Sequence, residues 1–108
     1  MIIATTDTVA GRNIARTIGF VKGNTVRACD LSEDLLAFVK NLVGGELTEY
    51  THVIAQAREQ ALDRMVQEAK TLGADAVVGV QFSSFFITRG AAEIMAYGTA
   101  VVLEEGEQ

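Results

Sequence analysis

Residues 72–80, with the sequence LGADAVVGV, constrain the fold of this chain more than any other segment. The first glycine predicts the end of a long helix, because glycine readily adopts the left-handed conformation that closes helices. The apolar run after it predicts a strand, and a second small-residue motif, YGTAV at residues 97–101, falls inside a later strand. Such residues mark places where two backbones pack closely. We therefore expect Gly73, Gly79 and Gly98 to be structural.

Two segments have the apolar periodicity of helices. The first begins at Asp30, a suitable N-cap, and ends at the glycine pair Gly44 and Gly45. The second is expected over residues 49–72. Its buried stripe is predicted at positions spaced by three or four residues: Tyr50, Ile54, Ala57, Ala61, Met65, Ala69 and Leu72.

The remaining residues predict extended segments at 1–6, 14–20, 21–28, 76–88 and 92–103. We expect interruptions at Gly19 and at residues 22–24, where Lys-Gly-Asn is typical of a hairpin turn. The last two segments carry apolar residues on both faces: Ile94 and Ala96 alternate with Met95 and Tyr97. Helices cover one face of a small sheet, so a partner chain is expected to bury part of the other. The sequence thus predicts a small two-layer α+β domain that self-associates.

Length and charge limit the classes of protein that fit. The 108 residues suit a single domain, 1–108, with a frayed tail at 104–108. No apolar run approaches the roughly 18 residues of a membrane span, and the N-terminus does not resemble a signal peptide. The net charge of −5, with dispersed basic residues, argues against nucleic-acid binding. A lone cysteine fits a reducing compartment, so we expect a cytoplasmic protein without membrane or nucleic-acid partners.

The chain resembles the YbjQ-like family, whose members have no assigned function and are labelled heavy-metal-binding. The resemblance spans residues 11–102 and is carried by these elements: Gly44-Gly45-Glu46 followed by Tyr50, Ala57-Arg58 with Ala61, residues 72–79, and residues 98–101. It implies a subunit similar to those of dodecins, with a small sheet against helices. It also implies a homopentamer, or a multiple of five, in which strand pairing joins neighbouring subunits.

The metal label finds little support in the residues themselves. A structural zinc site requires about four Cys or His ligands, and the chain has one of each. Glu49 and His52 have the Glu-x-x-His spacing of metal sites in helix bundles, but such sites take further carboxylates from facing helices. Cys29 is the one thiol available to a soft metal, although a free cysteine is more often a small buried residue. A ring could also assemble a site from one residue per subunit. The sequence therefore does not decide whether the protein binds a metal cofactor.

The candidate ligand-binding residues are Cys29, Tyr50 and Arg58. No nucleophile with a partner base accompanies them, so no catalytic residue is predicted. The favoured function is an oligomeric binding module without catalytic activity, with an unidentified ligand. Two alternatives stay open: an enzyme with active sites at subunit interfaces, and a scaffold for other proteins. The first needs an interface pocket with convergent ionisable groups, and the second needs an exposed apolar patch.

Overall fold

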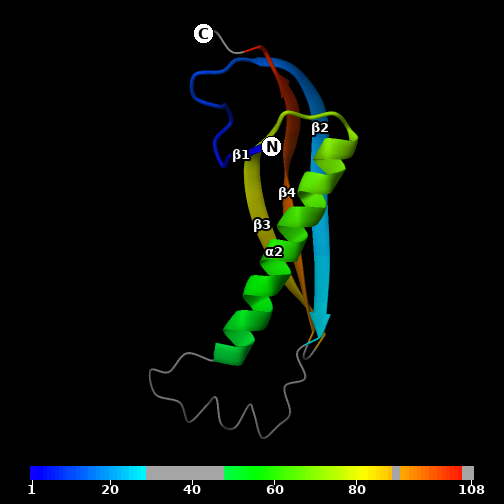
Figure 1. Ribbon diagram of the computed structural model, residues 1–108. Helices are drawn as coiled ribbons and strands as arrows, with labels where there is room; N and C mark the ends of the chain where they lie inside the picture. Colours follow the sequence, from blue (N-terminus) through cyan, green and yellow to red (C-terminus); the bar gives the residue numbers. More distant parts are fainter. Residues whose placement is uncertain (29–47, 89–90, 106–108) are drawn as a thin grey trace, which may run out of the picture.

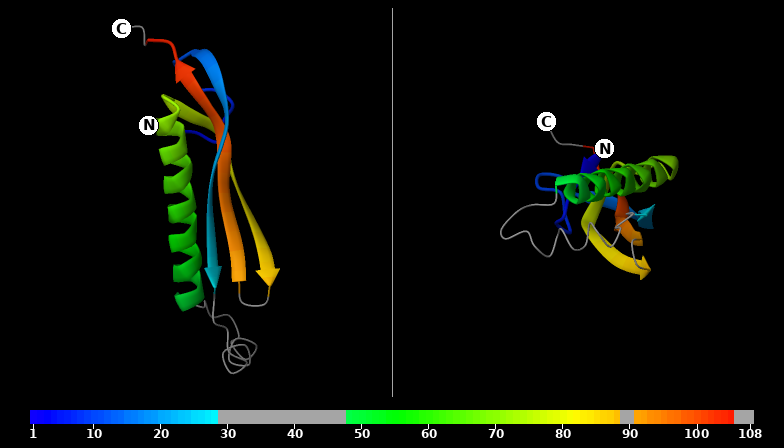
Figure 2. Two further views of the ribbon diagram at one scale, coloured as in Figure 1. Left: turned by 90° about the vertical axis from the view of Figure 1, so that its right-hand side faces the viewer. Right: turned by 90° about the horizontal axis from the view of Figure 1, so that it is seen from below.

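The computed structural model describes residues 1–28, 48–88 and 91–105. Its elements in these ranges are β1 (Ile2–Ile3), β2 (Ile14–Ala28), α2 (Thr48–Thr71), β3 (Ala76–Thr88) and β4 (Ala91–Leu103). The strands form one four-stranded sheet in the order β1-β3-β4-β2. The short β1 runs parallel to β3, and the other neighbouring strands are antiparallel. Helix α2 lies along one face of this sheet (Figures 1 and 2).

The predicted α+β class is confirmed for the described residues, with a helix layer on a sheet layer. The helix predicted from Asp30 and its closing glycines, Gly44 and Gly45, lie outside the described residues. The ring assembly and the similarity to dodecin subunits stay predictions.

Strand β2 differs from the sequence-based expectation. The hairpin turn predicted at residues 22–24 is wrong, because the strand runs unbroken from Ile14 to Ala28 beside β4. Gly23 lies in the middle of this strand, directly under the helix. A Cβ atom at this position would overlap the carbonyl oxygen of Ala61 and the amide nitrogen of Met65. The glycine therefore permits close packing of helix on strand.

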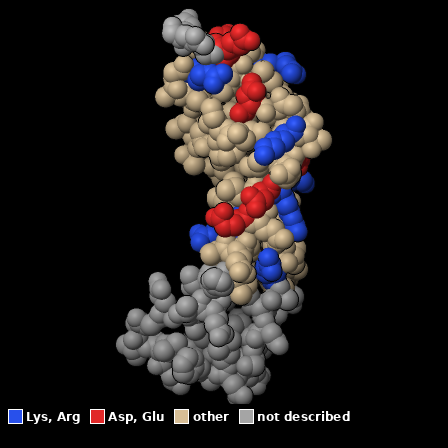
Figure 3. All heavy atoms as spheres, in the orientation of Figure 1, with Lys and Arg blue, Asp and Glu red and all other residues tan. Residues whose placement is uncertain are grey.

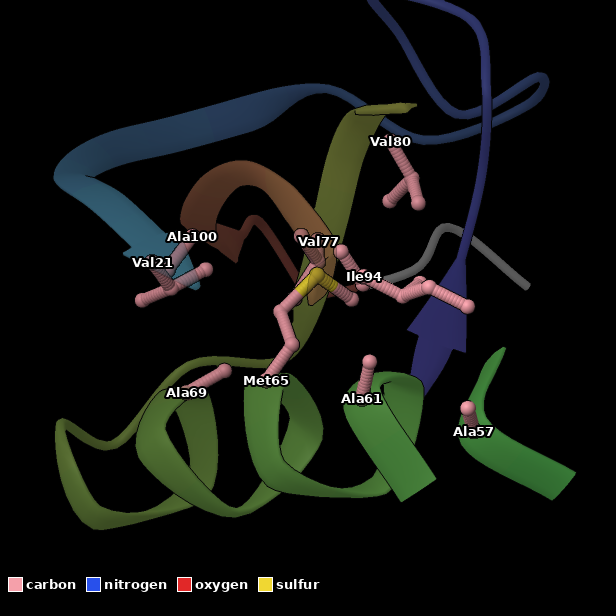
Figure 4. Close-up of a cluster of buried hydrophobic side chains, with 10 residues drawn as sticks. Val21, Ala57, Ala61, Met65, Ala69, Val77, Val80, Ile94 and Ala100 are labelled. Atoms are coloured by element: carbon pink, nitrogen blue, oxygen red, sulfur yellow. The ribbon is translucent and has the colours of Figure 1, made fainter. Parts of the chain in front are cut away.

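The main core lies between α2 and the sheet (Figure 4). The helix contributes four fully buried side chains at spacings of four residues, namely Ala57, Ala61, Met65 and Ala69. Small alanine side chains let the helix axis approach the sheet, and Met65 reaches toward Val77 and Ile94. The predicted stripe is confirmed at these four positions. It is wrong at Leu72, which is 48% exposed because it lies in the turn beyond the last helical residue.

Gly73 ends helix α2 as predicted. Its φ of 82° lies in the left-handed region, where glycine carries no steric penalty. The Gly73 amide donates to the Lys70 carbonyl, and the Ala74 amide donates to the Ala69 carbonyl, both at 3.0 Å. This pair of bonds is the Schellman motif, which satisfies carbonyl groups at a helix C-terminus.

The rest of the small-residue motif joins β3 to β4. The Leu103 amide donates to the Asp75 carboxylate, and the Asp75 amide donates to the Val101 carbonyl, both at 2.9 Å. Gly79 has a φ of 61° and sits in a β-bulge of β3 opposite Gly98. The motif that dominates the sequence therefore closes a helix, anchors a strand and shapes a bulge.

The face of the sheet opposite α2 is covered near the N-terminal segment, where Val9 and Ile14 contact a second cluster. That cluster consists of Ala76, Val78, Val101 and Leu103. Farther along the same face, Phe20, Val26 and Phe85 are exposed, with Phe20 at 60%. We call the surface formed by these three residues the open sheet face. In the described part of the chain, no helix covers it (Figure 2).

Candidate functional site

A pocket of about 300 Å³ opens between the N-terminal half of α2 and the far half of β3. Helix α2 supplies one wall, β3 the opposite wall, and β4 the floor. The lining residues are Ile54, Arg58, Phe82, Ser83, Ser84, Phe85, Phe86, Ala92 and Ile94. The described lining thus combines mostly apolar walls with a single guanidinium group.

The strand register explains why two phenyl rings lie on the helix side of β3. Phe82 pairs with Ala96, and Phe86 pairs with Ala92; both alanines are buried on the helix side of the sheet. Paired residues of antiparallel strands share a face, so the two rings share it too. Phe86 is nevertheless 80% exposed.

The exposure of these rings follows from the shortness of β1. This strand pairs only with Ala76 and Val77, and further backbone bonds from the N-terminal segment reach as far as Val80. Beyond Val80, no other strand lies on the outer edge of β3 in the described part of the chain. The pocket is therefore open along a free strand edge.

Arg58 is the only ionisable residue among the described residues that line the pocket. Its side chain is exposed, and within the described ranges it makes no hydrogen bond or ion pair. The buried Ala57 and Ala61 fix the helix backbone on either side of it. The pocket can consequently hold an apolar group beside a negative one, with Ser84 as a further polar residue on the helix side of β3.

The sequence predicted Arg58 as a ligand-binding residue, and the structure places it in this pocket. Helix α2 includes positions 49, 50 and 52, but the side chains of Glu49, Tyr50 and His52 are outside the described part. Cys29 lies outside the described residues altogether. Among the predicted binding and metal residues, Arg58 is therefore the one whose side chain the structure describes.

Sequence reasoning missed the aromatic residues of the pocket. The signal was present in the segment FSSFF, residues 82–86, which puts aromatic residues on both faces of a predicted strand. Side chains of a strand point alternately to its two faces, so Phe82 and Phe86, four positions apart, lie on the same face. Their role depends on the uncovered edge of β3, which strand periodicity does not encode.

The described residues do not fit a metal site. Among them, no group of three or more His, Cys, Asp or Glu side chains is placed to hold a metal ion. The described residues of the pocket lining also include no thiolate, imidazole or carboxylate, the side-chain groups that most often bind transition metals.

Charged side chains form no broad patch on the face shown in Figure 3. Basic and acidic groups are interspersed over it, in contrast to the clustered cations typical of nucleic-acid-binding surfaces. Within the described ranges, no helix is long and apolar enough to cross a membrane.

Comparison with known proteins places this architecture in a family. A family model described as "Putative heavy-metal-binding" matches residues 1–104, so the chain belongs to the YbjQ-like family. A UPF0145 protein of Archaeoglobus fulgidus is 55% identical over 103 residues, covering 95% of each chain. A UPF0145 protein of Thermus thermophilus is 48% identical over 108 residues, covering 100% of this chain and 95% of the relative.

A solved structure supports the fold. It is a protein of unknown function from Pediococcus pentosaceus, assigned to the DUF74 family. It superposes with a TM-score of 0.64 at 18% identity and covers 96% of this chain and 98% of its own. At this identity, the similarity shows the fold alone.

Proposed function

We propose that this protein is a self-assembling binding module without catalytic activity, and that its copies form a homopentamer or a multiple of five. The observation that carries this proposal is the open sheet face. Phe20, Val26 and Phe85 leave apolar surface in water on a sheet whose other face is already packed against α2. Large exposed apolar side chains on a sheet face, here interspersed with polar residues such as Lys22 and Glu93, are typical of association sites.

The two outer strands support the same proposal. Strand β2 ends the sheet on one side with 15 residues, and residues beyond Val80 in β3 form its far edge in the described part. Unpaired strand edges present rows of amide and carbonyl groups that readily pair with another chain. The family resemblance, which implies strand pairing between neighbours, agrees with this arrangement.

The pocket supports binding over catalysis. General acid–base chemistry needs a group that exchanges protons near neutral pH, and a guanidinium stays protonated. In the part of the lining that the structure describes, Arg58 is the only ionisable residue. The lone cysteine of the sequence favours action in the cytoplasm, where thiols stay reduced.

Phe20→Lys is expected to break the assembly, because association through the open sheet face would bury an unpaired ammonium, at a cost of several kcal/mol. Light scattering after size exclusion is expected to show a shift to smaller species. Gln67→Lys, which adds the same charge at an exposed position of α2, is the matched control and is expected to keep the wild-type mass. Circular dichroism checks that both variants are folded. An unchanged mass for folded Phe20→Lys would exclude this face as the interface.

The proposal also predicts the metal content of the purified protein. Because the described residues offer no ligand cluster, the purified protein is expected to hold no stoichiometric zinc. If a soft metal binds, Cys29 is its thiolate, and Cys29→Ser is expected to abolish binding while the assembly persists. A site on the ring axis would instead give about one metal per ring. Elemental analysis by plasma mass spectrometry distinguishes these cases. A ratio near one per chain that survives dialysis in both wild type and Cys29→Ser would contradict the account.

A further inference from the structure

We propose that the pocket beside α2 binds a small amphipathic anion, namely a carboxylate carried on a flat apolar body. This inference rests on the proposed function, because it names the ligand class of the binding module. Arg58 receives the carboxylate, and Phe82 and Phe86 contact the apolar body.

The charge of the lining selects an anion. The chain as a whole has a net charge of −5, which repels anions. Among the described residues, the pocket lining contains no carboxylate to oppose Arg58, so within this part of the chain its guanidinium makes the local charge positive. A guanidinium offers paired N–H donors that match the two oxygens of a carboxylate.

The walls select an apolar, flat body. Phe82 and Phe86 present phenyl rings from alternate positions of one strand, while Ile54 and Ile94 supply aliphatic surface. A bound ring system would remove much of this apolar surface from water and stack against the phenyl groups. The volume of about 300 Å³ is at the lower limit of small-molecule sites, which favours a compact ligand.

Neither part of the lining suffices alone. Inorganic phosphate would engage Arg58 and leave the rings exposed. An uncharged hydrocarbon would cover the rings and leave the guanidinium unpaired. Only a ligand with both features uses every wall of the pocket.

Isothermal titration calorimetry on the full-length assembled protein tests this inference. The probes are 2-naphthoate and its uncharged counterpart 2-naphthamide, which share the same ring system. We expect 2-naphthoate to bind about tenfold more tightly, since a charge-assisted hydrogen bond is stronger than a neutral one. Inorganic phosphate is expected not to compete.

Three variants assign the binding to named residues. Arg58→Gln is expected to remove the tenfold preference for 2-naphthoate while leaving 2-naphthamide unaffected. Lys70→Gln, which removes the same charge from an exposed position in the last turn of α2, is expected to leave both affinities unchanged. Phe86→Ala is expected to weaken both probes by a similar factor.

The failures of the two proposals are distinguishable. Equal affinity for the two probes, or a preference that survives Arg58→Gln, would overturn the ligand class. The assembly proposal would still hold if the protein had the mass of the expected ring. A monomeric protein that still prefers 2-naphthoate about tenfold would overturn the assembly proposal and support the ligand class. Binding by dissociated Phe20→Lys but not by the wild type would show that another copy covers the pocket, and would also overturn the ligand proposal.

Discussion

Gly23→Ala is expected to destabilise the protein by about 3 kcal/mol or more, through overpacking. The added methyl group would occupy the space of the Ala61 carbonyl oxygen and the Met65 amide nitrogen, and it would lie 2.8 Å from the Arg64 Cβ. Two of these three atoms belong to the helix backbone and cannot rotate away. The whole helix must therefore shift, and with it the core side chains of α2.

The sign of this effect is diagnostic. Alanine normally stabilises a strand interior by roughly 0.5–1 kcal/mol relative to glycine, because glycine loses more backbone entropy on folding. Urea denaturation at a fixed protein concentration measures the change in unfolding free energy. Gln67→Ala, at an exposed position of α2 away from the open sheet face, is the control and is expected to stay within about 0.5 kcal/mol. A Gly23→Ala variant at least as stable as the wild type would show that α2 does not contact β2 here.

Gly98→Val is expected to cost about 1–3 kcal/mol for a related reason. A Cβ atom on Gly98 would lie 2.8 Å from Val77 Cγ1 and 2.9 Å from the Val78 carbonyl oxygen. The valine side chain can adjust, but the carbonyl belongs to the strand backbone beside the bulge at Gly79. The neighbour that excludes a side chain is thus β3.

The same denaturation experiment measures this variant. Thr99→Val places the same side chain one position along β4, on the half-buried opposite face, and is expected to change stability by about 0.5 kcal/mol or less. If Gly98→Val left both the denaturation midpoint and the oligomer mass unchanged, the position would be open and the packing described for β3 would be incorrect.

Much of the local structure could be predicted from sequence because periodicity and turn chemistry are local. The spacing of alanines and Met65 predicted the helix that the structure places at Thr48–Thr71. The predicted strand 76–88 coincides with β3, and Gly73 closes α2 as expected. Each of these features depends on neighbours within a few residues.

Gly23 shows where local reasoning fails. The Lys-Gly-Asn sequence is typical of a turn, but a glycine is equally required where a helix crosses a strand. The two cases differ only in whether a helix packs against the glycine. That depends on α2 residues about 40 positions later in the chain. The pocket escaped prediction similarly, because it exists only where β1 ends and leaves β3 uncovered.

The two proposed surfaces lie on different sides of the sheet. The open sheet face is opposite α2, whereas the pocket lies between α2 and β3. Association through the open sheet face and the β2 edge would therefore leave the pocket accessible, whereas a strand added at the β3 edge would lie beside its opening.

Native mass spectrometry of the wild-type protein at micromolar concentration tests the assembly most directly. The account predicts a dominant species with the mass of five chains of 11.6 kDa each, or of a multiple of five. A dominant species of 11.6 kDa would contradict it, because a single chain leaves the open sheet face in water.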